Sequence, residues 1–356
     1  MPLCNRYWQK GLAVKQYKTI LIIKMSSLGD VLHALPTLAA LRQNCPQARI
    51  VWAVHPNFAA VLPAKPYIDD VIYIDKKGLK SLSYLRRLRH DLHQYQFDMS
   101  LDLQGLAKSA IVAFLSGAKE KYGYWEMREG SFLVSKGLAG PHKQDHVIER
   151  YLDTVRVLGG TVNGITFPLP DITAEKEKLK ERFQAQGLDG PYVAIVPGAR
   201  WDVKEWPIPY WQDLIQRIIS TGMAVVLLGS RDDAPKGAAI TAATGTNKVY
   251  DYTGKTNLKE LMAAISLSRL YISADTGPLH IANALKKELI ALFGPTSPAR
   301  TGPYGGPGST YIHILISPTA KATPAHPLVD DPACMSQLTV DTVWQTYEHI
   351  LAGGTP

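Results

Sequence analysis

The chain has few cysteines and no apolar segment of membrane-spanning length. Only three of its 356 residues are cysteine, at Cys4, Cys45 and Cys334, and none stands in a Cys-x-x-Cys pair or a Cys/His pattern with metal spacing. We therefore expect reduced thiols and no bound metal. The apolar runs fall well short of the about 20 residues that cross a bilayer, and the first residues interleave Lys and Arg with short apolar pieces, unlike a signal peptide. The sequence predicts a cytoplasmic protein.

Two nucleotide-binding motifs are also missing. No Gly-x-Gly-x-x-Gly follows a predicted strand, and no Gly-Lys-Ser/Thr phosphate loop occurs. These absences argue against a dinucleotide-dependent oxidoreductase and against a P-loop enzyme. We expect no cofactor, and transfer from a nucleotide-activated donor remains as the reaction class.

The formal charge of +8 favours an anionic partner. The densest basic stretch, residues 76–89, sets leucines at helical spacing among its lysines and arginines, which predicts an amphipathic basic helix. This helix is either an ordinary solvated surface or a docking surface for anionic lipid, and the sequence leaves both open. Its aromatic residues are not interleaved as in single-strand nucleic-acid binders, so we expect no nucleic-acid partner.

Strands and helices alternate through both halves of the chain. In the first half the predicted strands are 20–24, 49–54, 71–74 and 97–102, and the predicted helices are 30–43, 79–93 and 105–116, followed by an irregular stretch at 119–143. Such alternation predicts a parallel α/β sheet wrapped by helices. Pro168 and Pro170 interrupt the pattern before it begins again, so we divide the chain into domains 1–170 and 171–335, with a last helix in 336–356.

Two strand-to-helix junctions each carry a small polar group. The first, "MSSLGDVLHALP", places Asp30 at the carboxyl end of a strand, and the second, "SADTGPLHIANAL", places Asp275, Thr276, Gly277 and His280 there. Parallel α/β sheets bind ligands at this edge. Asp30 is either a helix cap or a general base that accepts a hydroxyl proton. The free N–H groups at the start of the second helix suit a diphosphate.

Further charged residues follow other predicted strands. Arg200 and Lys204 are candidate counter-charges for phosphate, and Asp232 and Asp233 are candidate ligands of a ribose. Three residues of the first domain are candidates to meet a carboxylate or phosphate on an acceptor, with structural roles equally open: Gln104, Lys108 and Arg128.

An ordered series of motifs resembles a known family. The segments "MSSLGDVLHALPTL", "LDLQGLAKSA", "PGARWDVKEWP", "SADTGPLHIANAL" and "LFGPTSPARTGPYG" are similar to those of the bacterial lipopolysaccharide heptosyltransferases, glycosyltransferase family 9, and "QGLAKSA" and "MREGS" look most like heptosyltransferase I. The resemblance implies a GT-B fold, in which two Rossmann-like domains face each other across a cleft. It also implies an acceptor site on the first domain, a donor site on the second, and a C-terminal helix that packs back on the first.

The resemblance further implies a reaction and its residues. Heptose would pass from ADP-L-glycero-D-manno-heptose to the Kdo-lipid A core with inversion, by direct displacement without a metal, at the inner face of the inner membrane. Asp30 would be the general base and Lys204 the phosphate lysine. The resemblance also implies donor-binding roles for Asp275, Thr276, Gly277 and His280, and for Asp233 by position. Arg200 and Thr256 complete the expected donor-binding residues.

Two departures from the family pattern bear on the donor. Ala199 and Arg200 stand where heptosyltransferase I commonly carries a hydroxyl pair, so Arg200 is a candidate substitute, and Asp233 stands in the place of a ribose-binding glutamate. The sequence therefore leaves open a family 9 transferase that acts later in the core or uses another nucleotide-sugar. A non-catalytic binder of nucleic acid or anionic membrane is a remote alternative.

Overall fold

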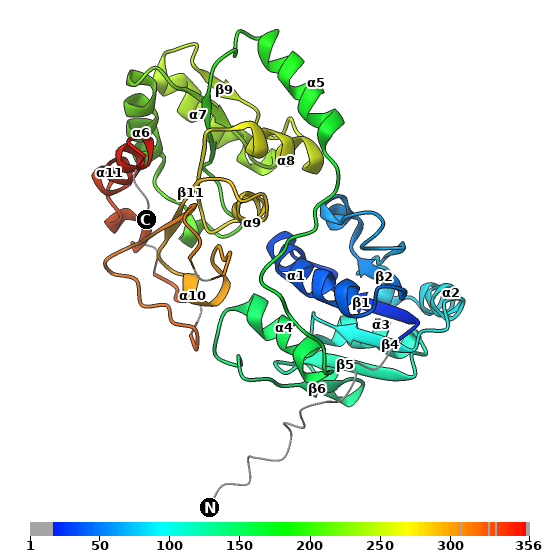
Figure 1. Ribbon diagram of the computed structural model, residues 1–356. Helices are drawn as coiled ribbons and strands as arrows, with labels where there is room; N and C mark the ends of the chain where they lie inside the picture. Colours follow the sequence, from blue (N-terminus) through cyan, green and yellow to red (C-terminus); the bar gives the residue numbers. More distant parts are fainter. Residues whose placement is uncertain (1–16, 307, 327, 332, 354–356) are drawn as a thin grey trace, which may run out of the picture.

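The structure is a computed structural model that describes residues 17–306, 308–326, 328–331 and 333–353. It consists of two α/β domains side by side (Figure 1). Cys4 and the extension through Gln16 lie outside the described residues, and the other two cysteines, Cys45 and Cys334, are buried and free. Among the described residues, no helix is long and apolar enough to span a membrane.

The first domain contains a sheet of six parallel strands in the order β3-β2-β1-β4-β5-β6. The strands are β1 (Thr19–Ile23), β2 (Arg49–Val54), β3 (Asp70–Tyr73), β4 (Met99–Asp102), β5 (Glu120–Tyr124) and β6 (Lys136–Leu138). The helices are α1 (Leu28–Asn44), α2 (Leu82–His93), α3 (Ala107–Leu115) and α4 (Val147–Val157), with a short 3-10 helix, η1, at Pro56–Val61. Ile20 to Ile23 of the central strand β1 are fully buried, and burying one such side chain contributes about 1.5–3 kcal/mol.

The prediction of an irregular stretch at 119–143 is wrong, because β5 and β6 lie within it and complete the sheet. Strand β5, "EKYGY", begins with charged residues and buries only its last two positions, and β6 buries only its last residue. Neither forms the apolar run by which a buried parallel strand is predicted.

The second domain repeats the strand order of the first. Its sheet, β12-β11-β10-β7-β8-β9, shows the same parallel order when the strands are counted within the domain, and this is the order of a Rossmann fold. The strands are β7 (Tyr192–Val196), β8 (Ala224–Leu227), β9 (Val249–Asp251), β10 (Leu270–Ala274), β11 (Leu289–Phe293) and β12 (Ile312–Ile316). The helices are α5 (Thr173–Gln184), α6 (Ile208–Ser220), α7 (Ala234–Thr244), α8 (Leu258–Leu267), α9 (Gly277–Ala284), α10 (Pro298–Thr301) and α11 (Val340–Leu351). The predicted α/β class with two Rossmann-like domains is confirmed.

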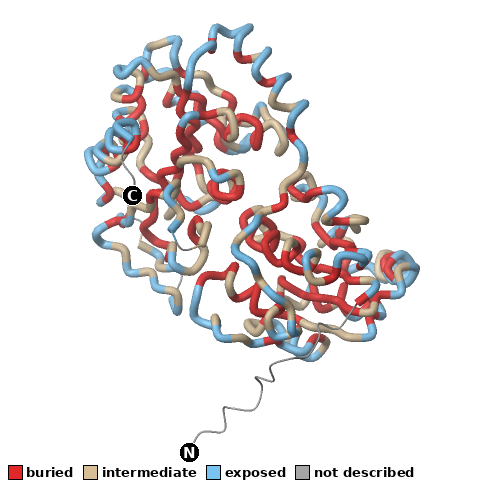
Figure 2. Tube along the Cα trace, in the orientation of Figure 1, coloured by how far each residue is buried: buried red, intermediate tan, exposed pale blue. Residues whose placement is uncertain are grey.

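The apolar core has three parts. One lies under α2 and α3 on the outer face of the first sheet, and another under α6 and α11 on the outer face of the second. The third is continuous between the domains and includes residues of α1, α4, α8 and α9. Figure 2 shows these buried residues along the sheets and the helices beside them, whereas the outer side of α5 is exposed.

The last helix corrects a prediction from the family resemblance. Helix α11 packs on α6 and β11 of the second domain, and not on the first domain (Figure 1). Its buried residues Val343, Tyr347 and Ile350 share a core with Trp211 of α6. An amphipathic helix buries its apolar face wherever a complementary surface is offered, and the sequence of the helix alone does not say which surface that is.

The domains meet through α1 and α9, η1 and α8, and α4 and α10. Helix α4 packs on strands β5 and β6 of the first domain, and helix α5 packs on α8 of the second. The chain therefore crosses between the domains in residues 158–172. The expected boundary between residues 170 and 171 falls in that crossing. Helices α1 and α9 both begin at the carboxyl end of a central strand, and this places the two polar junctions opposite each other.

Candidate functional site

A cavity of about 1310 Å³ lies between the two domains. It is lined by the loops at the carboxyl ends of both sheets, where parallel α/β folds bind ligands. Most of the residues singled out in the sequence line it together: Asp30, Gln104, Arg128, Arg200, Lys204, Asp232, Asp233, Thr256, Asp275, Thr276, Gly277 and His280. Lys108 does not line the cavity but lies exposed on α3.

Asp30 is the third residue of α1, and its two carboxylate oxygens differ in their surroundings. The Oδ2 atom accepts hydrogen bonds from the backbone N–H (2.9 Å) and the hydroxyl (2.6 Å) of Ser27. The Oδ1 atom lies 3.7 Å from the Lys24 ammonium, and 41% of the Asp30 side chain is exposed to the cleft. Ser27 is therefore the N-cap of α1, and Asp30 completes its capping box with Oδ2, while Oδ1 accepts no hydrogen bond from the described residues. The expectation that Asp30 is a general base stays a prediction.

The charge of Asp30 is stabilised by these neighbours. Burial between the domains raises the pKa of the carboxyl, but the Lys24 charge and the Ser27 hydrogen bonds outweigh this, and the net pKa lies below its ordinary value. Asp30 is thus ionised near neutral pH. A carboxylate with an accessible oxygen can accept a proton from a bound hydroxyl.

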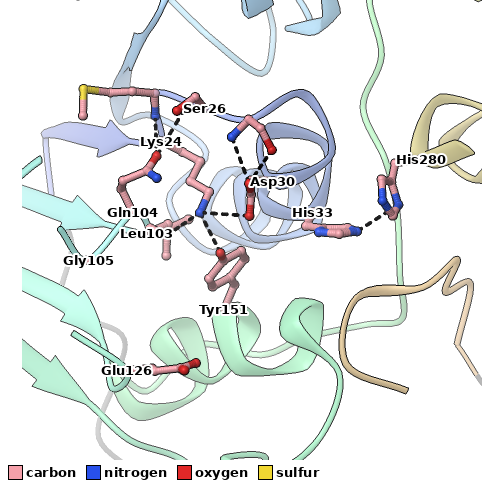
Figure 3. Close-up of polar contacts among 12 residues, drawn as sticks. Lys24, Ser26, Asp30, His33, Leu103, Gln104, Gly105, Glu126, Tyr151 and His280 are labelled. Carbon is pink, nitrogen blue, oxygen red and sulfur yellow. Dashed lines mark hydrogen bonds and ion pairs between the residues drawn. The ribbon is translucent and has the colours of Figure 1, made fainter. Parts of the chain in front are cut away.

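Gln104 supports the loop that carries Asp30. Its side-chain oxygen accepts hydrogen bonds from the backbone N–H groups of Met25 (3.1 Å) and Ser26 (3.2 Å), as Figure 3 shows. This contact ties the loop after β4 to the loop after β1. The predicted acceptor residue therefore also has a structural role.

Lys204 and Asp275 form the principal ion pair on the opposite wall. The Lys204 ammonium lies 2.6 Å from Asp275 Oδ2, which also accepts a hydrogen bond from Thr296 Oγ1 at 2.8 Å. The side chain of Asp275 is 9% exposed and that of Lys204 is 17% exposed. Asp275 thus holds Lys204 at the cavity wall, next to the start of α9 at Thr276 and Gly277, where backbone N–H groups favour an anion.

Asp233 is largely occupied by its own turn. Its Oδ2 atom accepts hydrogen bonds from the backbone N–H (2.8 Å) and hydroxyl (2.7 Å) of Ser230, and its Oδ1 atom lies 4.0 Å from the Lys236 ammonium. Thr256 is half-buried in the cavity wall beyond it. One oxygen of Asp233 is free of hydrogen bonds and is the atom by which a ribose contact could be made.

Cations without an ion-pair partner among the described residues line the cleft from both domains. Arg128 and Arg200 are exposed and line the cavity. Lys76, which the sequence assigns to the basic helix, instead donates a hydrogen bond to the Ser26 hydroxyl at the cavity wall. Burial and the neighbouring charges of Lys108 and Arg200 lower the pKa of Lys76. This part of the cleft is therefore suited to an anionic ligand.

Three histidines, from three different helices or their caps, meet where the domains touch. His33 Nε2 of α1 lies 3.1 Å from His280 Nδ1 of α9, and His146, the cap of α4, stacks on Tyr304. His280 Nε2 faces Asp275 Oδ1 at 3.8 Å, so the ring links the domain contact to the Lys204 ion pair. His280 lines the cavity as predicted, but its ring is also part of the domain interface. Sequence reasoning missed His146, because no strand was predicted before the helix that it caps, and β6 was among the strands that the sequence did not reveal.

A carboxylate also bridges the domains. Glu126, in the segment between β5 and β6, binds the Arg300 guanidinium of α10 through both oxygens at 2.7 Å and contacts Arg150 at 3.2 Å. Figure 3 places Glu126 below the Asp30 network, near Tyr151 of α4. No local pattern marks Glu126 as functional, because its partners Arg150 and Arg300 come from other parts of the chain.

The sequence of this chain is similar to a known family and to several curated proteins. The family described as glycosyltransferase family 9 (heptosyltransferase) matches residues 85–322. Lipopolysaccharide heptosyltransferase 1 of Pseudomonas aeruginosa is 27% identical over 297 residues, which cover 80% of this chain and 81% of that protein. Lipooligosaccharide heptosyltransferase 2 of Haemophilus influenzae is 30% identical over 298 residues, with 80% and 85% covered.

Solved structures of heptosyltransferases share the fold. The structure of E. coli heptosyltransferase WaaC with ADP has a TM-score of 0.74 and 25% identity, and covers 93% of this chain and 99% of that one. E. coli ADP-heptose lipopolysaccharide heptosyltransferase II has a TM-score of 0.76 at 24% identity, with 94% and 99% covered. The expected GT-B arrangement is confirmed.

Proposed function

We infer the function of this chain from one premise: it belongs to glycosyltransferase family 9, the heptosyltransferases. It is a heptosyltransferase of lipopolysaccharide core synthesis. We propose in addition that the donor is ADP-L-glycero-D-manno-heptose and that the acceptor is the Kdo-lipid A inner core. The observation that carries this proposal is the placement of an ionised carboxylate, Asp30, in the same cavity as a lysine and a helix N-terminus.

The proposed reaction is a single displacement. Asp30 Oδ1 accepts the proton of an acceptor hydroxyl while that oxygen forms a bond to the anomeric carbon of the heptose. The bond between this carbon and the β-phosphate oxygen breaks, and ADP leaves with the electron pair. Attack opposite the leaving group inverts the anomeric configuration. A positioned base typically contributes about 10²- to 10⁴-fold to such a rate.

The second domain is suited to stabilise the leaving diphosphate. The Lys204 ammonium and the N–H groups at Thr276 and Gly277 would meet the negative charge that grows on ADP. Arg200 is exposed at the same cavity and supplies a second cation in place of the family's hydroxyl pair. We assign the ribose to the free oxygen of Asp233 and to Thr256.

The first domain is suited to an anionic sugar acceptor. Kdo carries a carboxylate, and Lys76 and Arg128 at the cavity wall are cations without an ion-pair partner among the described residues, with Lys108 close to Lys76 but outside the cavity lining. Arginine binds carboxylates in a bidentate manner, which would orient the Kdo ring toward Asp30. We propose that these residues select the acceptor.

We further propose that the enzyme contacts the cytoplasmic face of the inner membrane peripherally. Leu82 of α2 is 72% exposed and Phe114 of the neighbouring α3 is 61% exposed, beside the exposed arginines Arg86, Arg87 and Arg89. Apolar side chains within a basic surface favour anionic lipid. Sedimentation with vesicles should show binding that requires anionic lipid and weakens in Arg86→Glu/Arg87→Glu. Equal binding to neutral vesicles would contradict an electrostatic contact.

A second specificity within the family is also favoured by an observation. Relatives named heptosyltransferase 2 are as similar to this chain as those named heptosyltransferase 1, and Arg200 departs from the pattern of the first type. Such an enzyme would act on an acceptor that already carries heptose.

Mass spectrometry of the product distinguishes these proposals. The purified chain is incubated with ADP-heptose and either Kdo-lipid A or the same acceptor with one heptose. One added heptose on Kdo-lipid A supports the leading proposal, and addition only to the second acceptor supports the alternative. No addition to either, together with tighter binding of UDP than of ADP, would show that the donor is another nucleotide-sugar.

A further inference from the structure

Lys24 is a buried lysine at the centre of the site. It follows β1 directly, is 2% exposed, and lies between the two loops that support Asp30. Its ammonium donates hydrogen bonds to the Leu103 carbonyl (2.8 Å) and the Tyr151 hydroxyl (2.7 Å), and lies 3.7 Å from Asp30 Oδ1. Figure 3 shows that the Lys24 Nζ atom makes all three contacts.

A buried ammonium is costly unless it is paired and hydrogen-bonded. Two carboxylates lie near Lys24. The oxygens of Asp102 are already engaged by the N–H groups of Gln104 and Gly105 and by the Ser109 hydroxyl. Asp30 is the carboxylate within ion-pair distance, so it supplies the counter-charge that stabilises Lys24 in this position.

The arrangement of contacts around Asp30 is asymmetric. Ser27 occupies Oδ2 with two hydrogen bonds, whereas Oδ1 faces the Lys24 ammonium at 3.7 Å, a distance longer than a hydrogen bond. The Lys24 charge therefore acts on Oδ1 and leaves that oxygen without a hydrogen bond from the described residues, so that it can accept one from a ligand. Leu103 and Tyr151 fix the ammonium and prevent it from closing on Oδ1.

We propose that Lys24, held by Tyr151 and the Leu103 carbonyl, is a positioning residue that keeps Asp30 ionised with Oδ1 directed at the acceptor hydroxyl. This inference rests on the proposed function, in which Asp30 is the general base. Lys24 does not touch the reacting atoms, and its effect passes through the charge and orientation of Asp30.

Four titratable groups surround Asp30, and together with burial they determine how far the loss of Lys24 shifts its pKa. Lys24 faces it from the end of β1, His280 from α9, Tyr151 from α4 and Lys76 from the segment after β3. Burial raises the pKa of Asp30, and among the groups that lower it the Lys24 charge is the largest, ahead of Ser27 and His280. Removal of an opposite charge at this distance raises a carboxyl pKa by about 1–3 units.

The first test is the pH profile of kcat/KM for Lys24→Met, which keeps an unbranched side chain and removes the charge. We expect the acid limb to move up by about 1–3 pH units relative to the native enzyme, with the affinity for ADP unchanged. Lys119→Met is the matched control, because Lys119 pairs with Asp98 at 2.8 Å on the same domain but outside the cleft. An acid limb that stays in the same place in Lys24→Met overturns the proposal.

If Lys24→Met does not fold, Tyr151→Phe provides a second test of the proposal. It removes one hydrogen bond to the ammonium and leaves the charge in place, so we expect a lower kcat with a smaller shift of the acid limb. A kcat equal to that of the native enzyme would overturn the positioning role of the Tyr151–Lys24 contact.

A readout independent of sugar transfer separates this inference from the proposed function. The carboxyl carbon of Asp30, labelled with ¹³C and assigned by its loss in Asp30→Asn, reports the ionisation of Asp30 by NMR. Its titration should move to higher pH in Lys24→Met. If the native protein transfers no heptose but the titration moves, the proposed function fails and the Lys24–Asp30 coupling stands; if transfer occurs and the titration does not move, the inference fails alone.

Discussion

His33 Nε2 and His280 Nδ1 lie 3.1 Å apart at the contact between the two domains. Each ring belongs to a helix that begins at the ligand-binding edge of its own sheet, and His280 also faces Asp275, the partner of Lys204. A ring-to-ring hydrogen bond needs one neutral acceptor nitrogen. The contact that joins the domains therefore depends on the protonation of histidines.

This contact predicts a domain arrangement that is stable at neutral and alkaline pH and is lost in acid. Burial lowers the pKa of His33, His280 and His146, the last to about 3, because a charged ring there loses its water. Because the three rings are neutral in the domain contact, they stabilise that contact fully above the ordinary histidine pKa of about 6.5. This stabilisation falls as the pH drops below that value, since free histidines then take up protons. Small-angle scattering at pH 8 and pH 5 should show a larger radius of gyration in acid.

The matched variants are His33→Gln and His90→Gln. The first removes a titrating ring from the interface and should reduce the change with pH, whereas the second alters an exposed histidine of α2 and should leave it as in the native protein. A radius of gyration that is constant from pH 8 to pH 5 would show that these histidines do not control the domain contact.

The Glu126–Arg300 bridge should contribute more than an exposed ion pair. Both oxygens of Glu126 bind one guanidinium, and the two side chains are only 23% and 19% exposed. A double-mutant cycle with Glu126→Gln and Arg300→Met, measured by chemical unfolding, should give a coupling of about 1–3 kcal/mol. The same cycle at Arg49 and Asp70, which are 53% and 37% exposed, should give less than about 1 kcal/mol. Equal couplings would contradict a special role for the bridge.

Gly29 is required for the close approach of α1 to α9. A Cβ atom at Gly29 would lie 2.4 Å from Cδ2 of His280 and 3.0 Å from its Nε2, so the ring would have to move. We expect Gly29→Ala to destabilise the protein by about 1–3 kcal/mol and to lower transfer activity. Gly190→Ala is the control, since no atom lies within 4 Å of its Cβ position. Thermal unfolding and transfer assays of the two variants test this, and equal values for both would refute it.

Loss of Lys204 should weaken binding of the donor. Lys204→Ala removes the cation that faces the predicted diphosphate, and a hydrogen bond between charged groups contributes about 1.5–3 kcal/mol. We expect the Kd for ADP to rise by about 10- to 100-fold in calorimetry. Lys180→Ala removes an exposed lysine that pairs with Glu177 on α5 and should leave the Kd unchanged. An unchanged Kd in Lys204→Ala would remove the phosphate role from this residue.

The parts of the fold that the sequence predicted are those with local signals. The apolar run of β1 and the cap at Asp30 are both local, and the structure brings this junction to the same cavity as Lys204 and Thr276. Strands β5 and β6 were missed because their residues are polar or small and owe their pairing to neighbouring strands. Lys24 was missed for a related reason. A lysine after an apolar run looks like the exposed end of a strand, and its three partners come together only in the folded protein.

Interactions between the domains were beyond sequence reasoning altogether. His146 and Glu126 meet Gly302 and Arg300 from more than a hundred residues away. The place of α11 on the second domain is likewise set by the surface that α6 offers. Spacing along the chain carries no information on such pairs.

The central claim is that Asp30 is the base in heptose transfer, and the most direct measurement compares kcat for the native enzyme and Asp30→Asn with ADP-heptose and Kdo-lipid A. The amide keeps the size of the side chain but accepts no proton, so kcat should fall by about 10²- to 10⁴-fold while the Kd for ADP stays within about twofold of the native value. A kcat within about tenfold of the native value, with ADP binding intact, would contradict the account.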